Sequence, residues 1–358
     1  MIVIDGSMGE GGGQILRTAL GLSAVLGKPI RIINIRAGRP NPGLRRQHMI
    51  AVKAVAAISN ARVRGLRLGS TVLEFEPDGL RSGRFRFDIG TAGSVTLVFQ
   101  ALMPVLPFVP GPVEVELRGG TDVPWSPPID YVRFVLSRLL ERFGFRVEVE
   151  LYRRGHYPRG GGRVVFRVAE PPGRLRAVSL VERGEVRRVE GLSHAVRLPR
   201  HVAERQARAA MELLRSRLSG VPVHVDVEWY EPSRDRHLGP GSGVVVWALT
   251  EHSVLGGDSL GARGKRAEVV GEEAAKKLLE DLETGMALDR HASDMLFPIA
   301  LLACGESLLG GARLTMHAYT NMEVARIMAG DRGVVELVRG GEREKPFVAR
   351  VRGLCLQR

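Results

Sequence analysis

The chain has 358 residues, of which 44% are hydrophobic and 25% are charged, and it carries a formal net charge of +13. This composition excludes disordered, collagen-like and coiled-coil proteins. The length predicts about two domains, with ample apolar material for a core.

The positive charge is concentrated in one part of the chain. Residues 11–73, which we call the acid-free segment, contain no Asp or Glu but eleven Arg and Lys residues. A local excess of positive charge predicts a polyanionic ligand or partner, although a generally basic surface would give the same excess. Because no aromatic residue precedes Phe75, the segment has no platform for stacking bases, and this favours contacts with phosphates.

Location and redox state are inferred from what the sequence lacks. The N-terminus has neither the basic nor the apolar region of a signal peptide, and the longest apolar stretch, residues 94–115, is interrupted by Gln100 and several prolines. We therefore expect a cytoplasmic protein without a membrane span. Cys304 and Cys355 are the only cysteines and form no C-x-x-C pair, so neither a disulfide framework nor a structural zinc site is expected.

The first 170 residues contain an internal repeat. Gly13 and Gly93 occupy equivalent positions 80 residues apart, and Gly38 and Gly120 do so at 82 residues. In the first copy we predict helices at 13–26 and 43–58 and strands at 30–35, 62–68, 72–76 and 84–88. In the second copy we predict helices at 95–105 and 129–143 and strands at 113–117, 146–152 and 163–168.

A third copy is interrupted by material of a different pattern. We predict a charged amphipathic helix at 200–218, strands at 224–229 and 244–250, a return loop at 256–265, an apolar helix at 292–304 and a strand at 313–316. The predicted fold is therefore α/β (α+β), with three repeated ββαβα-type units in residues 1–183 and 267–358. Residues 184–266 are predicted to form a smaller inserted α/β domain.

The residues Gly9-Glu10-Gly11-Gly12-Gly13-Gln14 lie between a short predicted strand and the first helix. Successive glycines allow backbone N–H groups to converge on an anion at a helix N-terminus. The pattern matches neither the phosphate loop G-x-x-x-x-G-K-[ST] nor the Rossmann fingerprint. A tight turn for packing would explain it, but Arg17 and the arginines downstream favour a phosphate site. Glu10 would then either hold Mg²⁺ or complement the charge of the helix N-terminus.

Three further polar segments follow along the chain. Residues 154–164 contain a Pro and three consecutive glycines, which a structural hairpin explains without a catalytic role for His156. His317 follows the predicted strand at 313–316, and an imidazole there is able to attack phosphorus and hold a nucleotide as a phosphoramidate. Ser293 or Asp294 would cap the predicted helix that begins nearby.

These motifs together resemble those of the RNA 3′-terminal phosphate cyclases over nearly the whole chain. The matching residues are Asp5-Gly6, Gly9-Glu10-Gly11-Gly12-Gly13-Gln14-Ile15-Leu16-Arg17, Ile35-Arg36-Ala37-Gly38-Arg39, Pro42-Gly43-Leu44, Gln47-His48, Gly119-Gly120-Thr121-Asp122, Pro127-Pro128 and the segment 154–164. The resemblance implies three repeats like the C-terminal domain of bacterial initiation factor three. It also implies an inserted domain of thioredoxin-like topology.

The resemblance further implies an ATP-dependent, ligase-like activity. His317, in the matching His-x-x-Thr-Asn segment, would attack the α-phosphorus of ATP, release pyrophosphate and become adenylylated. The AMP would pass to an RNA 3′-phosphate and give an RNA-(3′)pp(5′)A end. The neighbouring 2′-OH would then expel AMP and leave a 2′,3′-cyclic phosphate. The lysine motif of ordinary nucleic-acid ligases, K-x-D-G, is absent from the chain.

The resemblance assigns roles to individual residues. The expected partners are ATP, Mg²⁺ or Mn²⁺, and an RNA with a 3′-phosphate end. Where the family commonly has Tyr-x-x-Asp-Gln, this chain has His291-Ala292-Ser293-Asp294-Met295. The implied ATP and phosphate ligands are Glu10 (also the metal ligand), Arg17, Arg36, Arg39, Gln47, Gln100, Pro127, His291 and Asp294.

Two other functions are alternatives. A cyclase-like ribosome-biogenesis protein shares the fold but acts as a non-catalytic RNA-binding factor without the active histidine, and the presence of His317 beside the Glu10, Arg17 and Arg39 set argues against it. An enolpyruvyl transferase built from similar repeats would need a Lys- and Asp-rich site for a small carboxylate substrate, and the presence of only six lysines disfavours it.

Overall fold

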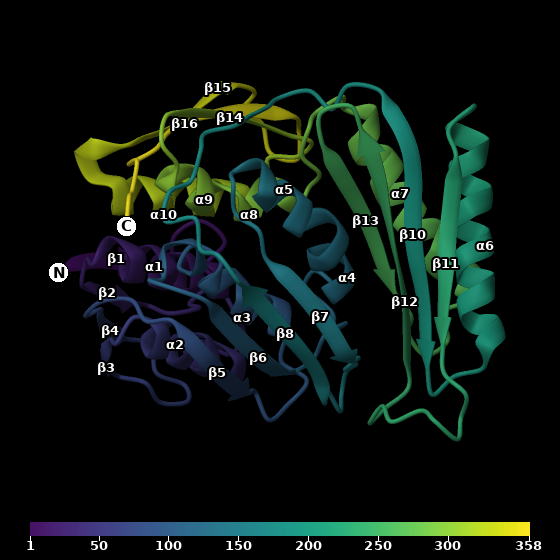
Figure 1. Cartoon of the computed structure of the whole chain (residues 1–358), viewed down its shortest axis with the longest axis horizontal. Helices are drawn as coiled ribbons and strands as arrows, with labels where there is room; N and C mark the ends of the chain where they lie inside the picture. The colour runs from purple at the N-terminus through teal and green to yellow at the C-terminus, as the bar shows by residue number, and fades with distance from the viewer.

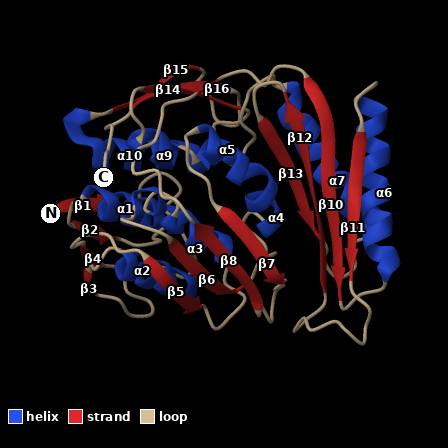
Figure 2. Ribbon diagram, in the orientation of Figure 1, coloured by secondary structure: helices blue, strands red, loops and turns tan.

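The computed structural model, which describes residues 1–358, contains one kind of four-stranded sheet three times (Figures 1 and 2). In each sheet the first two strands are parallel and the remaining neighbours are antiparallel. The strand orders are β1 (Ile2–Asp5), β2 (Ile30–Ile33), β4 (Leu73–Glu76), β3 (Arg62–Arg64); β5 (Gly83–Asp88), β6 (Val113–Gly119), β8 (Gly162–Val168), β7 (Glu148–Arg153); and β9 (Ser179–Leu180), β14 (Glu306–Gly311), β16 (Phe347–Arg352), β15 (Val334–Arg339).

Helices follow the first and the second strand of each sheet. The repeat is therefore strand, helix, strand, helix, strand, strand. The strand predicted at 84–88 opens the second unit, since β5 pairs with β6, and its predicted place at the end of the first unit is wrong. The helices are α1 (Gly13–Leu26), α2 (Arg46–Ile58), α3 (Val95–Leu102), η1 (Leu106–Phe108), α4 (Ile129–Tyr131), the π-helical turn η2 (Val132–Leu136), α5 (Ser137–Arg142), α8 (Ala292–Met295), α9 (Phe297–Leu302), α10 (Met316–Ala329) and η3 (Gly330–Arg332).

The helices of the three units pack against one another, and the sheets of the three units enclose them (Figure 1). Twelve of the fourteen residues of α1 are buried, and all six residues of α9 are buried, because other elements surround these helices. By contrast, β5 and β7 alternate between exposed and partly buried residues, so one face of each of these strands meets solvent. One apolar cluster of 73 buried residues runs through all three units.

A fourth sheet lies between β9 and α8 in the chain. It has the order β11 (Val223–Trp229), β10 (Val186–Val196), β12 (Gly241–Thr250), β13 (Val254–Leu260), and only β10 and β11 are parallel. Two helices, α6 (Arg200–Arg217) and α7 (Ala267–Glu283), pack together on this sheet and form a separate core of 16 residues. Because α7 contributes to this core, the predicted domain boundary at residue 266 divides it.

The return loop predicted at 256–265 is wrong, since β13 occupies much of that range. The two glycines that suggested a loop are needed for close packing inside a sheet. A Cβ on Gly256 would lie 2.8 Å from the ring of Tyr131, and one on Gly257 would lie 2.4 Å from the carbonyl oxygen of Ala274. Glycine in a strand interior often marks such a close approach.

The strand predicted at 313–316 is also wrong. The strand of this region is β14, and the chain then enters α10, whose N-cap is Thr315. The Oγ1 of Thr315 accepts a hydrogen bond from the N–H of Ala318 at 3.0 Å, which fixes the start of the helix. His317 therefore lies in the first turn of a helix rather than at the end of a strand.

The two cysteines form a disulfide bond, Cys304–Cys355, which corrects the expectation that the cysteines form no disulfide framework. Cys304 follows α9 and Cys355 follows β16, and a sequence separation of 51 residues gives no hint that the two meet. The predicted absence of a membrane-spanning helix is consistent with the structure, in which no helix combines the length and the hydropathy needed to cross a bilayer.

Candidate active site

The glycine-rich turn at 9–13 packs against α10 on one side and α2 on the other. A Cβ on Gly9 would lie 2.2 Å from Oγ1 of Thr320, and one on Gly13 would lie 2.3 Å from Nε2 of His48. The backbone N–H of Glu10 donates to Oγ1 of Thr320 at 3.0 Å. Glycine is therefore required for close packing here, and that packing brings Glu10 to the first turns of α10.

Glu10 lies between Arg39 and His317. Its Oε1 is paired with the guanidinium of Arg39, and its Oε2 lies 3.5 Å from Nδ1 of His317. This second oxygen is buried and accepts no hydrogen bond. Glu10 therefore has one oxygen engaged in an ion pair and one available to a proton donor or a cation.

His317 is uncharged at neutral pH but remains accessible. Burial, followed by the positive charges of Arg17, Arg39 and His291, lowers the pKa of His317 to about 4. Its side chain is 46% exposed. When the proton lies on Nδ1, beside Glu10, the lone pair is on Nε2. The imidazole thus has the protonation state of a nucleophile.

Arg17, on α1, is a buried cation without an anionic partner. Only 8% of the residue is exposed, its Nε has no hydrogen-bond partner, and burial lowers its pKa to about 10. One turn earlier, Oε1 of Gln14 is also buried and unpartnered. An unpaired buried charge is strongly unfavourable. The position therefore indicates that an anion from outside the chain completes the pair.

Arg36 and Arg45 organise the loop that leads into α2. Nη1 of Arg36 donates to the carbonyl oxygens of Asn41 at 2.7 Å and Gly43 at 2.9 Å, and Arg36 itself has a positive φ of 58°. The N–H of Arg45 donates to Nδ1 of His48, and burial together with the neighbouring arginines lowers the pKa of His48 to about 3. The Arg36 guanidinium is thus used largely within its own loop.

Asp294 is buried beneath the start of α10 and connects three helices. Its carboxylate accepts a hydrogen bond from Thr315, and its carbonyl oxygen accepts one from Nδ2 of Asn321 at 2.6 Å. Oδ1 of Asn321 in turn accepts from Oγ1 of Thr18 at 2.7 Å. Burial raises the pKa of Asp294 to about 7. Asp294 therefore holds α10 in place against α8 and α1.

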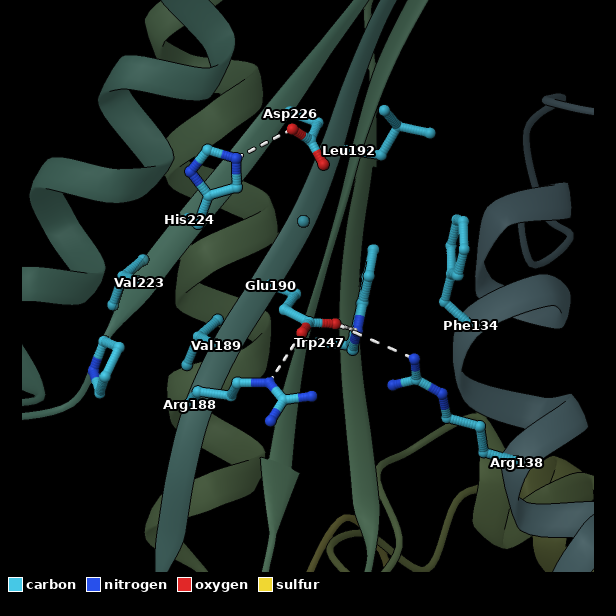
Figure 3. Close-up of a pocket in the computed structure, with 12 residues that line it drawn as sticks. Phe134, Arg138, Arg188, Val189, Glu190, Leu192, Val223, His224, Asp226 and Trp247 are labelled. Atoms are coloured by element: carbon cyan, nitrogen blue, oxygen red, sulfur yellow. Dashed lines mark hydrogen bonds and ion pairs between the residues drawn. The ribbon is translucent and has the colours of Figure 1, made fainter.

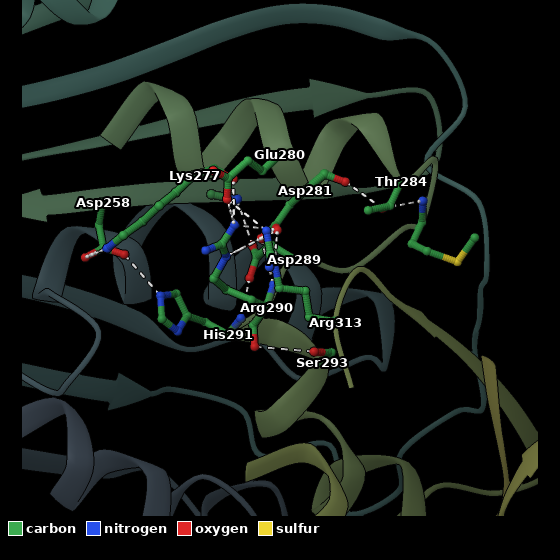
Figure 4. Close-up of polar contacts among 12 residues, drawn as sticks. Asp258, Lys277, Glu280, Asp281, Thr284, Asp289, Arg290, His291, Ser293 and Arg313 are labelled. Carbon is green, nitrogen blue, oxygen red and sulfur yellow. Dashed lines mark hydrogen bonds and ion pairs between the residues drawn. The ribbon is translucent and has the colours of Figure 1, made fainter. Parts of the chain in front are cut away.

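His291 provides a further positive charge near His317, besides those of Arg17 and Arg39. Its Nε2 lies 3.1 Å from Oδ1 of Asp258 on β13, as Figure 4 shows. Burial alone would lower the pKa of His291, but the hydrogen bond and the charge of Asp258 outweigh burial and raise it. The imidazolium is thus favoured, and the inserted sheet supplies the carboxylate that favours it.

Two buried aspartates hold the segment that carries His291 (Figure 4). Oδ1 of Asp289 accepts from the N–H of His291 at 2.9 Å and from the hydroxyl of Tyr131 at 2.8 Å. Asp281, on α7, accepts from the guanidinium of Arg290 at 2.8 Å. These bonds join the inserted sheet and its helix to the second and third units around one loop.

The remaining predicted residues are Gln47 on α2, Gln100 on α3 and Pro127 before α4, and the contacts of the first and the last are with the start of α3. Oε1 of Gln47 accepts from the N–H of Ser94, and the carbonyl oxygen of Pro127 accepts from Oγ1 of Thr96 at 2.8 Å. Gln100 donates to Sδ of Met295 at 3.0 Å. The structure therefore brings Glu10, Arg17, Arg39, His291 and His317 together, whereas Gln47 and Pro127 organise the start of α3 and make no direct contact with Glu10 or His317.

Sequence reasoning assigned no roles to several residues that shape the site. Thr320 and Asn321 belong to the His-x-x-Thr-Asn segment and lock α10 to the glycine-rich turn and to α1. Asp258 carried no signal at all, because the Gly- and Ser-rich residues around it were predicted to form a loop, whereas they belong to the buried strand β13. The pairing of Asp258 with His291 was visible only in three dimensions.

A recess of about 470 Å³ lies elsewhere, between the inserted sheet and the helix of the second unit. Figure 3 shows Phe134 and Arg138 facing Trp247 and Glu190 across it. Its one histidine, His224, is paired with Asp226. This recess shares no residue with the Glu10 and His317 cluster.

Known proteins with similar sequences share one description. Residues 8–333 match the profile of the family described as RNA 3′-terminal phosphate cyclase. The curated protein of that name from Hyperthermus butylicus is 71% identical over 355 residues, which are 99% of each chain. Those from Ignicoccus hospitalis and Staphylothermus marinus are 63% and 56% identical, over 100% and 99% of each chain.

Similarity to a solved structure is much weaker. An EPSP synthase from Acinetobacter baumannii aligns with 99% of this chain, at 12% identity and a TM-score of 0.30, and the chain spans only 65% of that protein. A TM-score this low carries no structural argument. The family profile and the full-length relatives, by contrast, agree with each other over nearly every residue. The chain therefore belongs to the RNA 3′-terminal phosphate cyclase family of enzymes.

Proposed function

We propose that the protein uses ATP to convert an RNA 3′-terminal phosphate into a 2′,3′-cyclic phosphodiester, through a covalent adenylate on His317. Membership of the family supports the overall reaction. The observation that carries the mechanism is the accessible, uncharged His317 beside a carboxylate and an unpaired buried arginine. The repeated strand order supports units like the C-terminal domain of initiation factor three, and the order of the inserted sheet supports a thioredoxin-like topology.

In the first step, Nε2 of His317 attacks the α-phosphorus of ATP and pyrophosphate leaves. The imidazole gains positive charge as the N–P bond forms. Glu10 faces Nδ1 of the same ring at 3.5 Å and would accept its N–H, which fixes the tautomer and stabilises that charge. The low pKa of His317 removes the need for a separate base to deprotonate it.

Positive charges around His317 would stabilise the phosphates. Arg17 offers an unpaired guanidinium, and Arg39 and His291 add two further cations near the same ring. Charge neutralisation on non-bridging oxygens is the main requirement for breaking the α–β phosphate bond. We expect Arg36 to act mainly by shaping the loop that presents Arg39, given its bonds to Asn41 and Gly43.

Glu10 is also the residue suited to a divalent metal. Its Oε2 is buried with no hydrogen-bond partner, which fits the hard oxygen ligands that Mg²⁺ and Mn²⁺ prefer. One carboxylate alone would hold such an ion only together with phosphate oxygens and water. A bound ion would supply Lewis-acid neutralisation of the triphosphate.

The nucleoside end of ATP would lie toward α3 and α8. Gln100 and Met295 contact each other there, and Pro127 packs at the start of α3. Asp294 would act by holding α10, and with it His317, in position. The family commonly carries Gln at the position of Met295. We expect Met295 to replace a polar contact to the nucleotide with an apolar one.

The second and third steps complete the cycle. An oxygen of the RNA 3′-phosphate attacks the phosphorus of the His317 adenylate, which breaks the N–P bond and forms RNA-(3′)pp(5′)A. The neighbouring 2′-OH then attacks the RNA phosphorus, loses its proton and expels AMP. ATP is thereby converted to AMP and pyrophosphate for each cyclic end formed.

Incubation of the protein with ATP labelled on its α-phosphorus, in the presence of Mg²⁺, tests the proposal. We expect an acid-labile, base-stable protein–AMP adduct that His317→Ala abolishes and His252→Ala, at an exposed histidine outside the site, retains. Adduct formation by His317→Ala would overturn the mechanism. Absence of any wild-type adduct together with binding of 3′-phosphate RNA would instead indicate a binding factor.

A further inference from the structure

A second polar cluster is buried where the second unit meets the inserted sheet. Asp122 follows β6, His156 lies in the segment between β7 and β8, and His194 lies on β10. All three are at least 93% buried, with exposed fractions of 2%, 7% and 1%. A Cβ on Gly241, at the start of β12, would lie 1.9 Å from the His156 ring, so the inserted sheet packs directly on this side chain.

The polar atoms of this cluster are poorly satisfied by the protein itself. Nε2 of His156 lies 3.0 Å from Nε2 of His194, and that is the rings' one hydrogen bond. Nδ1 of each ring is buried without a partner, and so is Oδ1 of Asp122. Buried polar groups in folded proteins are almost always paired, so a cluster with three unpartnered atoms indicates a missing ligand.

The charges of the surroundings indicate the sign of that ligand. Arg154, which is fully buried, contacts Asp122 at 3.3 Å, Asp130 at 2.7 Å and Glu228 at 2.7 Å. Arg133 adds one cation, at 2.8 Å from Asp130. By formal charge, the three carboxyl groups exceed the two guanidiniums by one.

The geometry suits a metal ion. One ligand atom from each of Asp122, His156 and His194 lies within 4.8 Å of the others. A tetrahedral ion with ligands at about 2.0–2.1 Å needs them about 3.4 Å apart, which small side-chain shifts would achieve. Oδ2 of Asp122 accepts from Thr121 at 2.6 Å and from Arg154, so Oδ1 is held free to bind.

We propose that Asp122, His156 and His194 bind a divalent transition-metal ion, with Zn²⁺ as the expected occupant, that clamps the inserted sheet to the second unit. Two imidazoles and a carboxylate form a ligand set that Zn²⁺ favours. The expectation that the chain has no zinc site rested on its two cysteines, and this cluster uses neither. None of the three ligands contacts Glu10 or His317, so the clamp is separate from the proposed chemistry of the catalytic site.

The test is metal uptake by the whole protein after chelation. Metal-free protein should bind one equivalent of Zn²⁺ and show a higher Tm that a chelator reverses. Co²⁺ should bind at the same place and produce the visible absorption of a nitrogen-ligated, four-coordinate ion. His156→Gln and His194→Gln should each weaken binding by roughly 100-fold or more, since losing even a residue that only hydrogen-bonds to a metal ligand costs about 10- to 100-fold.

The matched control is His224→Gln, because His224 is an exposed histidine paired with a carboxylate, Asp226, and would be an adventitious metal site. This variant should bind like wild type. The Co²⁺ spectrum of the wild-type protein keeps the test decisive even if a variant folds poorly. Failure of the folded wild-type protein to take up Zn²⁺ or Co²⁺, or unchanged affinity in both His156→Gln and His194→Gln, would overturn the proposal.

Discussion

Oε2 of Glu10 lies 3.5 Å from Nδ1 of His317, although the two residues come from the first and the last unit of the repeat. The N–H of Glu10 is also bonded to Thr320 on the same helix as His317. The site is thus assembled where the third unit packs back on the first.

Removal of the Glu10 carboxylate should slow the first chemical step. We expect Glu10→Gln to reduce the rate of adduct formation on the order of 100-fold, because the amide stabilises a charged imidazole less well. Glu323→Gln is the matched control, since Glu323 lies on α10, the helix that carries His317, but pairs with Arg326. Single-turnover adduct formation at saturating ATP measures both, and equal rates for wild type and Glu10→Gln would contradict this role.

The pH dependence of adduct formation should follow His317. Because its pKa is lowered to about 4, the ring stays uncharged and nucleophilic from neutral pH down to about pH 5. The rate should fall only as the pH approaches 4, well below the value of about 6.5 for an ordinary histidine. A half-maximal rate near pH 6.5, measured in single-turnover experiments, would show that the charges around His317 do not shift its pKa.

Arg17 should oppose folding and favour ATP binding. Replacement by Met removes an unpaired buried charge at similar volume, so we expect Arg17→Met to raise the free energy of unfolding of the ligand-free protein by about 1–3 kcal/mol. The same change should raise the Kd for ATP at least about tenfold, as a charged contact is lost. Thermal unfolding and calorimetric ATP titration measure the two effects.

Arg62→Met is the control for this experiment. Arg62 lies in the same acid-free segment but its side chain is 85% exposed. Its replacement should change neither stability nor ATP affinity appreciably. Destabilisation of the ligand-free protein by Arg17→Met would mean that Arg17 has a partner within the chain.

The acid-free segment predicts salt-sensitive binding of RNA. If arginines of this segment contact RNA phosphates as well as ATP, affinity for a 3′-phosphate oligonucleotide should fall with salt, by about 0.7 in log–log slope for each phosphate contact. Fluorescence anisotropy at a series of salt concentrations gives the slope. A flat response would confine the segment to ATP.

Asp294 should make the free energy of unfolding depend on pH. Its pKa is raised to about 7 in the folded protein, so the carboxyl keeps its proton where the unfolded chain has lost it. The stability that this group contributes is therefore fully present below about pH 4 and is lost as the pH rises toward 7. Asp294→Asn should remove that loss, so the difference in unfolding free energy between variant and wild type should change across this pH range. A difference independent of pH would contradict the raised pKa.

Local patterns predicted much of the fold but not its connections. The helix at 13–26 was predicted to the residue, because apolar residues, a glycine turn before it and Gly27 after it agree. The glycines of β13 led to a wrong prediction of a loop. Gly256 allows close contact with Tyr131 and Gly257 allows close contact with α7, and no local sequence pattern indicates either contact. The position of His317 was recognised from its motif, yet its placement in a helix depended on the cap by Thr315.

Charge partners were the least predictable part of the site. Arg17 and Arg39 both belong to the acid-free segment, yet Arg39 is paired with Glu10 and Arg17 is unpaired. Arg36, grouped with them by sequence, is engaged by Asn41 and Gly43. The partner of each arginine depends on which residues the fold brings close to it. The spacing of the arginines in the sequence does not contain this information.

The hydrogen bond from Glu10 to Thr320 spans 310 positions of the chain. During synthesis the residues of the glycine-rich turn are made long before His317, the nucleophile of the proposed reaction. A growing polypeptide would therefore hold a basic, anion-attracting surface but no nucleophile aligned to use it. The contact between the third unit and the first would then act as a checkpoint, since the proposed reaction with ATP would require both units to be made and folded.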